Sequence, residues 1–385
     1  MKKGLIALSF GTLSLGMAEF VMMGILPDVA RDLHIGIDTA GHLISAYALG
    51  VCAGAPALAL ARRFRLKHIL LVLATLIMAG NFCAAVAPDY GMLLVARFIS
   101  GIPHGAYFGV GTIVADKLAG KGKGSQAIAM MVSGMTLANL FGVPLGTSLS
   151  VALSWRITFL LVGCWSIVLL IALWRWVPHV PNLPDTGFKG QFRFLKSPAP
   201  WLLIGATALG NGGVFAWYSY INPLLTHISG FDPHVITLLM VLAGLGMVMG
   251  NFTGGYLSDR YNPGAVASIT QGSICLTLLA IFFLSPVSWL SVALMILCTT
   301  GLFTLSSPQQ ILIIRYSKGG ELLGTACIQI AFNLGNAIGA YCGGLTLHAG
   351  LDYRYPSLVG VPFALTGCLL LYIFYKRYNL VHYSR

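Results

Sequence analysis

Charged residues are scarce in this sequence. Asp, Glu, Lys and Arg make up only 9% of its 385 residues, whereas hydrophobic residues make up 57%. A soluble globular chain is about a quarter charged, and a disordered chain needs few apolar residues and much charge. Both classes are therefore excluded. A bilayer suits this composition, because lipid is an apolar solvent, so we expect an integral membrane protein.

Groups that would indicate catalysis or metal binding are also missing. The eight cysteines form no C-x-x-C pair and lie inside apolar runs, which is typical of small buried residues. The stretch 120–125 has neither the spacing nor the preceding strand of a phosphate-binding loop. No acid pair or nucleophile–base set is found. We expect no enzyme activity, no cofactor and no metal.

The net charge of +12 suggests nucleic acid as a partner at first sight. However, the basic residues are scattered between apolar runs, and no basic patch with interleaved aromatics occurs. We therefore expect no binding to nucleic acid. The excess of basic residues has a better explanation in the membrane topology.

Twelve apolar runs are long enough to cross a bilayer, which takes about 20 helical residues. The longest polar connection, 178–200, divides the chain into an N-terminal six-helix bundle, 1–177, and a C-terminal one, 201–385. The sequence thus predicts an all-α fold. The expected spans are 4–27, 39–61, 67–87, 91–115, 125–150, 155–177, 201–224, 234–257, 263–285, 288–314, 321–349 and 356–375.

Cytoplasmic loops of membrane proteins carry the excess of Lys and Arg. With the N-terminus inside, 19 of the 23 Lys and Arg residues fall in inner segments, and three fall in outer loops (Arg31, Arg156 and Arg354). The remaining one, Arg97, lies inside a span. Both termini are therefore expected to be cytoplasmic. The first run contains Glu19 and no clear cleavage site, so we expect a retained helix rather than a signal peptide.

The two halves are related by an internal repeat. The segment 60–64 after the second span matches 257–261 after the eighth, at an offset of 197 residues. Asn139 in the fifth span and Asn336 in the eleventh have the same offset. A six-plus-six repeat with a binding site between the halves is one known transporter architecture.

The sequence resembles the major facilitator superfamily, and within it the twelve-helix drug–proton antiporters. The stretches that carry this resemblance are 16–20, 101–106, 133–147, 214–217 and 318–324. It implies two pseudo-symmetric six-helix halves, a small-molecule substrate, and spans one, four, seven and ten around the cavity. It further implies a monomer in the bacterial inner membrane.

Family motifs indicate candidate gating residues. The loop motif of the superfamily keeps its acid and base in the second half, at Asp259 and Arg260, but Arg62 stands where the first half should have Asp. The antiporter motif of the fifth span is matched in part, by Gly142 and Pro144 among others. Pro144 lacks a backbone donor, so this span is expected to bend or to pack closely there.

Glu19 is the only acid deep in a predicted span, and such residues usually mark ion or proton pathways. Counted from Pro27 and from Gly91, Glu19 and Arg97 lie at similar depths, so a contact is possible. His104, two turns beyond Arg97, changes charge near neutral pH. We interpret these three as proton-coupling residues. The alternatives are a structural ion pair, an arginine reaching the membrane surface and a neutral histidine.

Candidate substrate-binding residues are polar or aromatic groups in the fourth and seventh spans, which are expected to line the cavity, and at the equivalent repeat positions of the fifth and eleventh spans. They are Asn211, Trp217, Asn139, Asn336 and Tyr107. Helix packing through interhelical hydrogen bonds is the alternative role for the asparagines and the tyrosine.

The sequence favours proton-driven efflux of a drug-like compound or a sugar. The alternative is a facilitator or importer without proton coupling. A receptor would be expected to have a sizeable extramembrane domain, and the sequence contains none.

Overall fold

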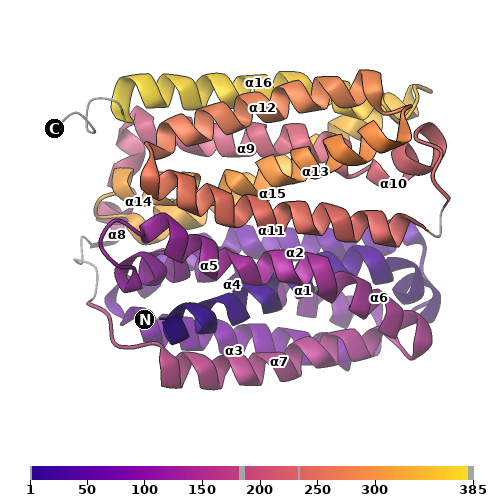
Figure 1. The fold of residues 1–385 in the computed structure, drawn as a ribbon. Coiled ribbons are helices and arrows are strands. Elements are labelled where there is room, and N and C mark those ends of the chain that lie inside the picture. The colour runs from indigo at the N-terminus through magenta and orange to yellow at the C-terminus, as the bar shows by residue number, and fades with distance from the viewer. Residues whose placement is uncertain (1, 182–186, 233–234, 380–385) are drawn as a thin grey trace. The chain divides into compact units, whose positions relative to one another are not determined.

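The computed structural model describes residues 2–181, 187–232 and 235–379 (Figure 1). Within these ranges every regular element is a helix. They divide into two compact units. Unit 1 is Met1–Arg193 with Lys318–Ile330, and unit 2 is Phe194–Ser317 with Ala331–Arg385.

Unit 1 contains six membrane-crossing segments. Eleven helices in the described residues are long and apolar enough to span a bilayer, five of them in this unit. Its other segment, α2, has 24 residues, or about 36 Å of helix. The segments are α1 (Lys2–Asp32), α2 (Ile37–Leu60), α3 (Leu66–Ala85), α4 (Tyr90–Leu118), α5 with α6 (Gly124–Leu137, Val143–Ala152) and α7 (Trp155–Trp176).

Unit 2 contains the other six segments. One of them, α15, begins in the part of the chain that belongs to unit 1. The segments are α9 (Pro198–Tyr218), α11 (Ile236–Arg260), α12 (Pro263–Leu284), α13 with α14 (Ser288–Thr304, Ser306–Tyr316), α15 (Glu321–His348) and α16 (Tyr355–Phe374). The short helices α8 (Gly187–Gln191) and η3 (Arg193–Lys196) lie in the connection between α7 and α9. The predicted all-α, twelve-span fold is confirmed.

Two predicted spans end in the wrong place. The first was expected to stop at Pro27, but α1 continues to Asp32, because membrane helices tolerate an internal proline. The seventh was expected to reach residue 224, but α9 stops at Tyr218. Pro223 has no N–H to bond back to Ser219, so the helix does not continue there unbroken. A short helix, α10 (Ile221–Pro223), and a π-helical turn, η4 (Leu224–Ile228), follow instead.

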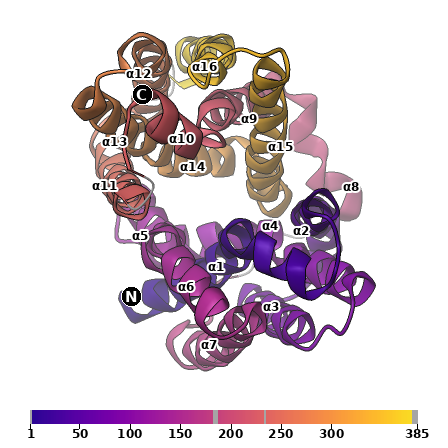
Figure 2. The same ribbon diagram turned by 90° about the vertical axis from the view of Figure 1, so that its right-hand side faces the viewer.

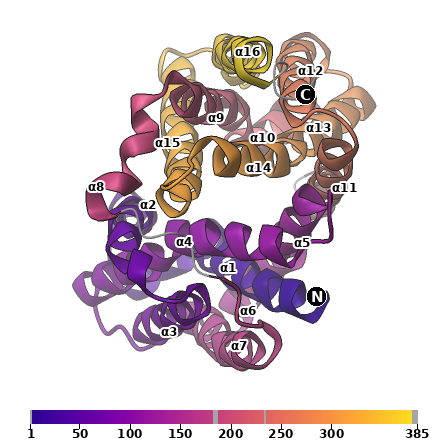
Figure 3. The same ribbon diagram turned by 90° about the vertical axis from the view of Figure 1, so that its left-hand side faces the viewer.

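The helices of each unit pack side by side. In unit 1, α1 contacts α2, α4, α5, α6 and α7, so it lies inside the bundle (Figure 2). In unit 2, α9 packs on α16, α12 on α16 and α13, and α11 on α13 (Figure 3). The neighbouring helices therefore cover α1 on several sides, including the stretch around Glu19.

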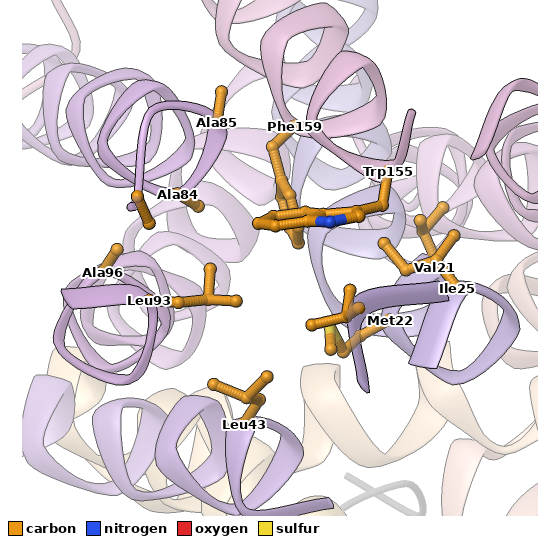
Figure 4. Packing of buried hydrophobic residues seen from close by; sticks show 12 residues of the cluster. Val21, Met22, Ile25, Leu43, Ala84, Ala85, Leu93, Ala96, Trp155 and Phe159 are labelled. Atoms are coloured by element: carbon orange, nitrogen blue, oxygen red, sulfur yellow. The ribbon is translucent and has the colours of Figure 1, made fainter. Parts of the chain in front are cut away.

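An apolar core fills one end of unit 1. Side chains of α1, α2, α3, α4 and α7 converge there, with Trp155 and Phe159 at the centre (Figure 4). Met22 and Ile25 of α1 contribute and are fully buried. Along α1 the core runs from Val21, two residues beyond Glu19, to Val29, and so lies between Glu19 and the helix end at Asp32.

Polar contacts fix the helix ends beyond that core. Asp32 accepts hydrogen bonds from Arg156 and from Trp155 Nε1, the latter at 3.0 Å. Both bonds lower the pKa of Asp32 below its ordinary value, and the bond from Arg156 contributes most. Arg156 also donates to Ala87 O at 3.0 Å. The ends of α1, α3 and α7 are therefore tied together.

Candidate functional site: a polar cluster inside unit 1

Four polar side chains meet in the middle of unit 1. They are Glu19 of α1, Tyr47 of α2, and Arg97 and His104 of α4, and we call them the polar cluster. Tyr47, Arg97 and His104 are at most 2% exposed. Glu19 is the most accessible, with 12% of its side chain exposed. The carboxyl of Glu19 is thus the least enclosed group of the cluster.

The direct partner of Glu19 is His104. Glu19 Oε2 lies 3.7 Å from His104 Nδ1. No ion pair between Glu19 and Arg97 is found in the described part of the chain. The structure therefore places the acid beside the histidine and leaves the arginine nearby without direct contact.

Arg97 and His104 both approach α1 near Glu19. Arg97 Nη1 donates to Ala18 O, and Ala18 precedes Glu19 in the chain, so the similar depth expected for Glu19 and Arg97 agrees with the structure. His104 lies seven residues beyond Arg97, or about 10 Å further along α4, and its Nδ1 is the group that lies within 4 Å of the carboxyl.

Tyr47 completes the environment of His104. Its hydroxyl lies 2.9 Å from the same Nδ1 that faces Glu19, and the two rings meet edge on, with centroids 5.8 Å apart. Phe108 stacks on the opposite side of the imidazole at 5.4 Å. A neutral Nδ1 can accept the tyrosine hydrogen, and a protonated one can donate to Glu19 or to Tyr47. Sequence reasoning missed Tyr47, because nothing in its apolar run distinguishes it from the other 14 tyrosines.

Arg97 is held by backbone carbonyls and an aromatic ring. Nη1 donates to Ala18 O at 2.6 Å and Nε to Leu43 O at 3.4 Å. The guanidinium lies over the Tyr47 ring, 4.5 Å from its centroid. Within the described residues its buried Nη2 has no hydrogen-bond partner. Arg97 thus supplies a fixed positive charge with one donor to spare, and it does not extend to the membrane surface.

Tyr107 and Asn139 use their polar groups in packing. Tyr107 donates to Leu8 O at 3.2 Å, and its ring occupies the space where Gly11 would carry a side chain. Asn139 donates to Met135 O, one turn earlier, at 3.1 Å. These contacts match the packing alternative, and a substrate role for either residue stays a prediction.

The other substrate candidates lie in unit 2. Asn211 is buried and donates to Thr207 O at 2.8 Å. Trp217 is 1% exposed, and its Nε1 has no partner among the described residues. The same holds for Asn336 Oδ1. The ring of Tyr218 lies beside that of Trp217, with centroids 5.9 Å apart, and Phe215 forms edge-on contacts with Tyr218 and Phe332. Trp217 and Asn336 therefore keep unused polar atoms, whereas the amide hydrogen of Asn211 is used within its own helix.

The candidate gating residues lie in two places. In α11, Arg260 donates to Tyr256 Oη at 2.7 Å, and Asp259 is half-buried next to it. In unit 1, a π-helical turn, η2 (Ala138–Gly142), separates α5 from α6, and Pro144 follows in the first turn of α6. Gly142 lies so close to Met17 that a Cβ would be 2.8 Å from its Cγ. The fifth span thus changes its helical bonding at the residues that the motif indicated.

No group of three His, Cys, Asp or Glu side chains that could hold a metal ion occurs among the residues described. The polar cluster has one carboxylate and one imidazole, which is too few for a metal site of the usual four ligands. The cluster places a carboxyl, an imidazole and a guanidinium close together inside unit 1.

Known proteins similar to this chain are membrane transporters. A protein of Escherichia coli (strain K12) named "Putative transporter AraJ" is 50% identical over 98% of this chain and 96% of its own. A Helicobacter pylori (strain P12) protein named "Probable sugar efflux transporter" is 27% identical over 95% of this chain and 92% of its own. Among solved structures, one of the E. coli fucose:proton symporter FucP matches with a TM-score of 0.78 and 15% identity, over 96% of this chain and 98% of that one.

The sequence profile of the Major Facilitator Superfamily matches residues 8–322 and again residues 221–382. The profile covers nearly the whole chain, and the fold and the relatives agree with it. The chain therefore belongs to the major facilitator superfamily of membrane transporters.

Proposed function

We propose that this transporter exports a small molecule and is driven by protons that enter through the polar cluster. Glu19 carries the proton, His104 shares it, and Arg97 is the fixed counter-charge. One observation carries the proposal: the carboxyl of Glu19, partly exposed in the middle of α1, lies 3.7 Å from His104 Nδ1. Ionisable groups at such depth are costly and mark ion or proton pathways.

The spare donor of Arg97 supports a switch between two arrangements. Protonated Glu19 is neutral and needs no counter-charge. Once the proton leaves, the carboxylate is attracted by the buried guanidinium, whose Nη2 has no partner in the described residues. Arg97 already donates to Ala18 O, next to Glu19 in sequence, so a change of side-chain rotamer brings the two charges together. A contact between α1 and α4 that depends on the protonation state of Glu19 can shift the equilibrium between the inward-open and outward-open states.

We propose efflux as the direction of transport. The resemblance to drug–proton antiporters and the name of the H. pylori relative both favour efflux. We propose a drug-like compound or a sugar as substrate. Trp217 Nε1 and Asn336 Oδ1, which are buried and unpaired among the described residues, are the groups most suited to bind its hydroxyl or carbonyl groups. Asn211, Asn139 and Tyr107 remain further candidates.

The membrane setting follows from the charge distribution. With 19 basic residues on one side against three on the other, we propose that both termini are cytoplasmic. We further propose a monomer in the bacterial inner membrane. On this arrangement Asp259, Arg260, Gly142 and Pro144 act in gating, and residues 178–200 form the linker between the bundles 1–177 and 201–385.

The experiment is transport by the purified full chain in proteoliposomes, with ethidium and radiolabelled monosaccharides as probes. Efflux coupled to protons responds to an imposed pH gradient and is abolished by a protonophore. In Glu19→Gln the response should disappear, because an amide of similar shape cannot release a proton. Asp28→Asn, on the same helix, is the control. Transport that ignores the gradient in the unaltered protein would support the facilitator alternative.

A further inference from the structure

Unit 1 contains a pocket whose lining includes none of the four residues of the polar cluster. It has a volume of about 390 Å³ and lies between α2, α3 and α4, next to the turn η1 (Ala61–Arg63). Its wall includes Leu58, Phe64, His68, Val72, Ile102 and Ala106. All of these except His68 are apolar. The volume is within the range of ligand pockets, about 300–1,000 Å³.

The outer rim of this groove is an exposed part of a membrane span. Val72, on α3, is 60% exposed, and Phe64, just before α3, is 63% exposed. In a helix that crosses a bilayer, exposed apolar side chains face hydrocarbon. The opening is therefore accessible to a lipid chain from within the membrane.

The chain segment at one end of the groove is rich in basic residues. Arg62, Arg63, Arg65, Lys67 and His68 fall within seven residues, and no acid occurs between Asp38 and Asp89. Arg65 and His68 are exposed, and His68 itself lines the pocket. The superfamily motif has an acid where this chain has Arg62. This segment therefore lacks the acid that the motif would supply.

The start of α3 adds to this charge. Its N-cap is Arg65, with no side chain that caps the first amides and no acid in the first turn. Free amides at a helix start carry partial positive charge and favour an anion. Lys67 donates to Trp174 O at 2.7 Å, which holds a further ammonium group near the end of α7.

We propose that this groove binds an anionic phospholipid. One acyl chain lies against Leu58, Ile102 and Ala106, and the phosphate is bound by Arg65, His68 and the first amides of α3. Basic pockets between membrane helices on the cytoplasmic side are suited to anionic head groups. A bound lipid fastens α2 to α3 and α4, and so stabilises the helix that carries Tyr47. The inference does not depend on proton coupling or on the transported substrate.

Native mass spectrometry of the full chain in detergent tests this, with phosphatidylglycerol and phosphatidylcholine of identical chains as probes. Phosphatidylglycerol should bind more tightly and raise Tm more. Arg65→Gln should weaken its binding about fivefold, and Lys121→Gln, in another exposed loop, should not. Val72→Trp should block the groove, whereas Leu276→Trp on α12, where Leu276 is 70% exposed, should leave binding unchanged.

Three results would overturn the proposal. Equal affinity for the two lipids would remove the head-group recognition. Unchanged binding in Val72→Trp would place the lipid elsewhere. Binding of oleate without binding of phosphatidylglycerol would make this a fatty-acid site.

Discussion

The hydroxyl of Tyr47 can be removed without its ring, which separates the packing of the polar cluster from the proposed proton exchange. Tyr47→Phe keeps the ring under Arg97, which lies 4.5 Å from its centroid, and removes the hydrogen bond of 2.9 Å to His104 Nδ1. Both residues are buried. A lost hydrogen bond that leaves a buried partner unsatisfied costs about 1–3 kcal/mol. We expect a loss of stability of that order, seen as a lower Tm in detergent.

The second expected effect is on pH dependence. Without the hydroxyl, Nδ1 of His104 has Glu19 as its remaining polar neighbour, at 3.7 Å. The equilibrium that distributes a proton between Glu19 and His104 should therefore change. The pH profile of gradient-driven transport should shift as a result. Tyr107→Phe is the matched control. That tyrosine is equally buried and its hydroxyl is also bonded, to Leu8 O at 3.2 Å. Both variants should lose stability, and only Tyr47→Phe should shift the profile. Identical profiles in the two variants would refute the role of Tyr47.

Further predictions concern packing, acid stability and topology. Gly101→Ala should destabilise the protein by about 1–3 kcal/mol or more, because its Cβ would lie 2.1 Å from Tyr47 O. Gly105→Ala, whose Cβ would lie 3.3 Å from Val51 O, should cost less. Comparison of their melting temperatures checks this, and equal losses would contradict it. Because the pKa of Asp32 is lowered, mainly by Arg156, its contribution to stability is present above the unfolded pKa of about 3.9 and is lost as pH falls through the folded value. Asp32→Asn should therefore lower Tm at pH 7, and the difference should close in strong acid; a difference that persists there would argue against the ion pair. Cysteines introduced at 62–67, 117–124, 185–196 and 315–320 should react only from the cytoplasmic side, and labelling of 185–196 from outside intact cells would overturn the topology.

The spans could be predicted from the sequence because one physical constraint dominates them. Every segment in lipid must satisfy its own backbone bonds, so apolar length and flanking polar residues nearly define each helix. Most ends agree within three residues, from α3 at Leu66–Ala85 to α12 at Pro263–Leu284. The exceptions, at the ends of α1 and α9, both follow from proline, whose effect on a helix depends on what the neighbouring helices supply.

The members of the polar cluster could be predicted only in part. Glu19, Arg97 and His104 stand out in the sequence because charge is costly in a membrane. Which of the two basic groups lies within 4 Å of the carboxyl could not be predicted, because Arg97 approaches the same turn of α1 and the choice depends on side-chain rotamers. Tyr47 was missed for another reason. Placing a tyrosine in a membrane span costs little free energy, so the residue does not stand out in the sequence, and only the packing of α2 on α4 brings it to His104.

The most direct test of the central claim is proton movement driven by substrate in proteoliposomes that contain a pH-sensitive dye. A gradient of a transported probe should move protons in the opposite direction in the unaltered protein and in Asp28→Asn. Glu19→Gln should still exchange labelled for unlabelled probe across the membrane, and yet move no protons. If Glu19→Gln moved protons as the unaltered protein does, Glu19 would not be the proton carrier and the account would be wrong.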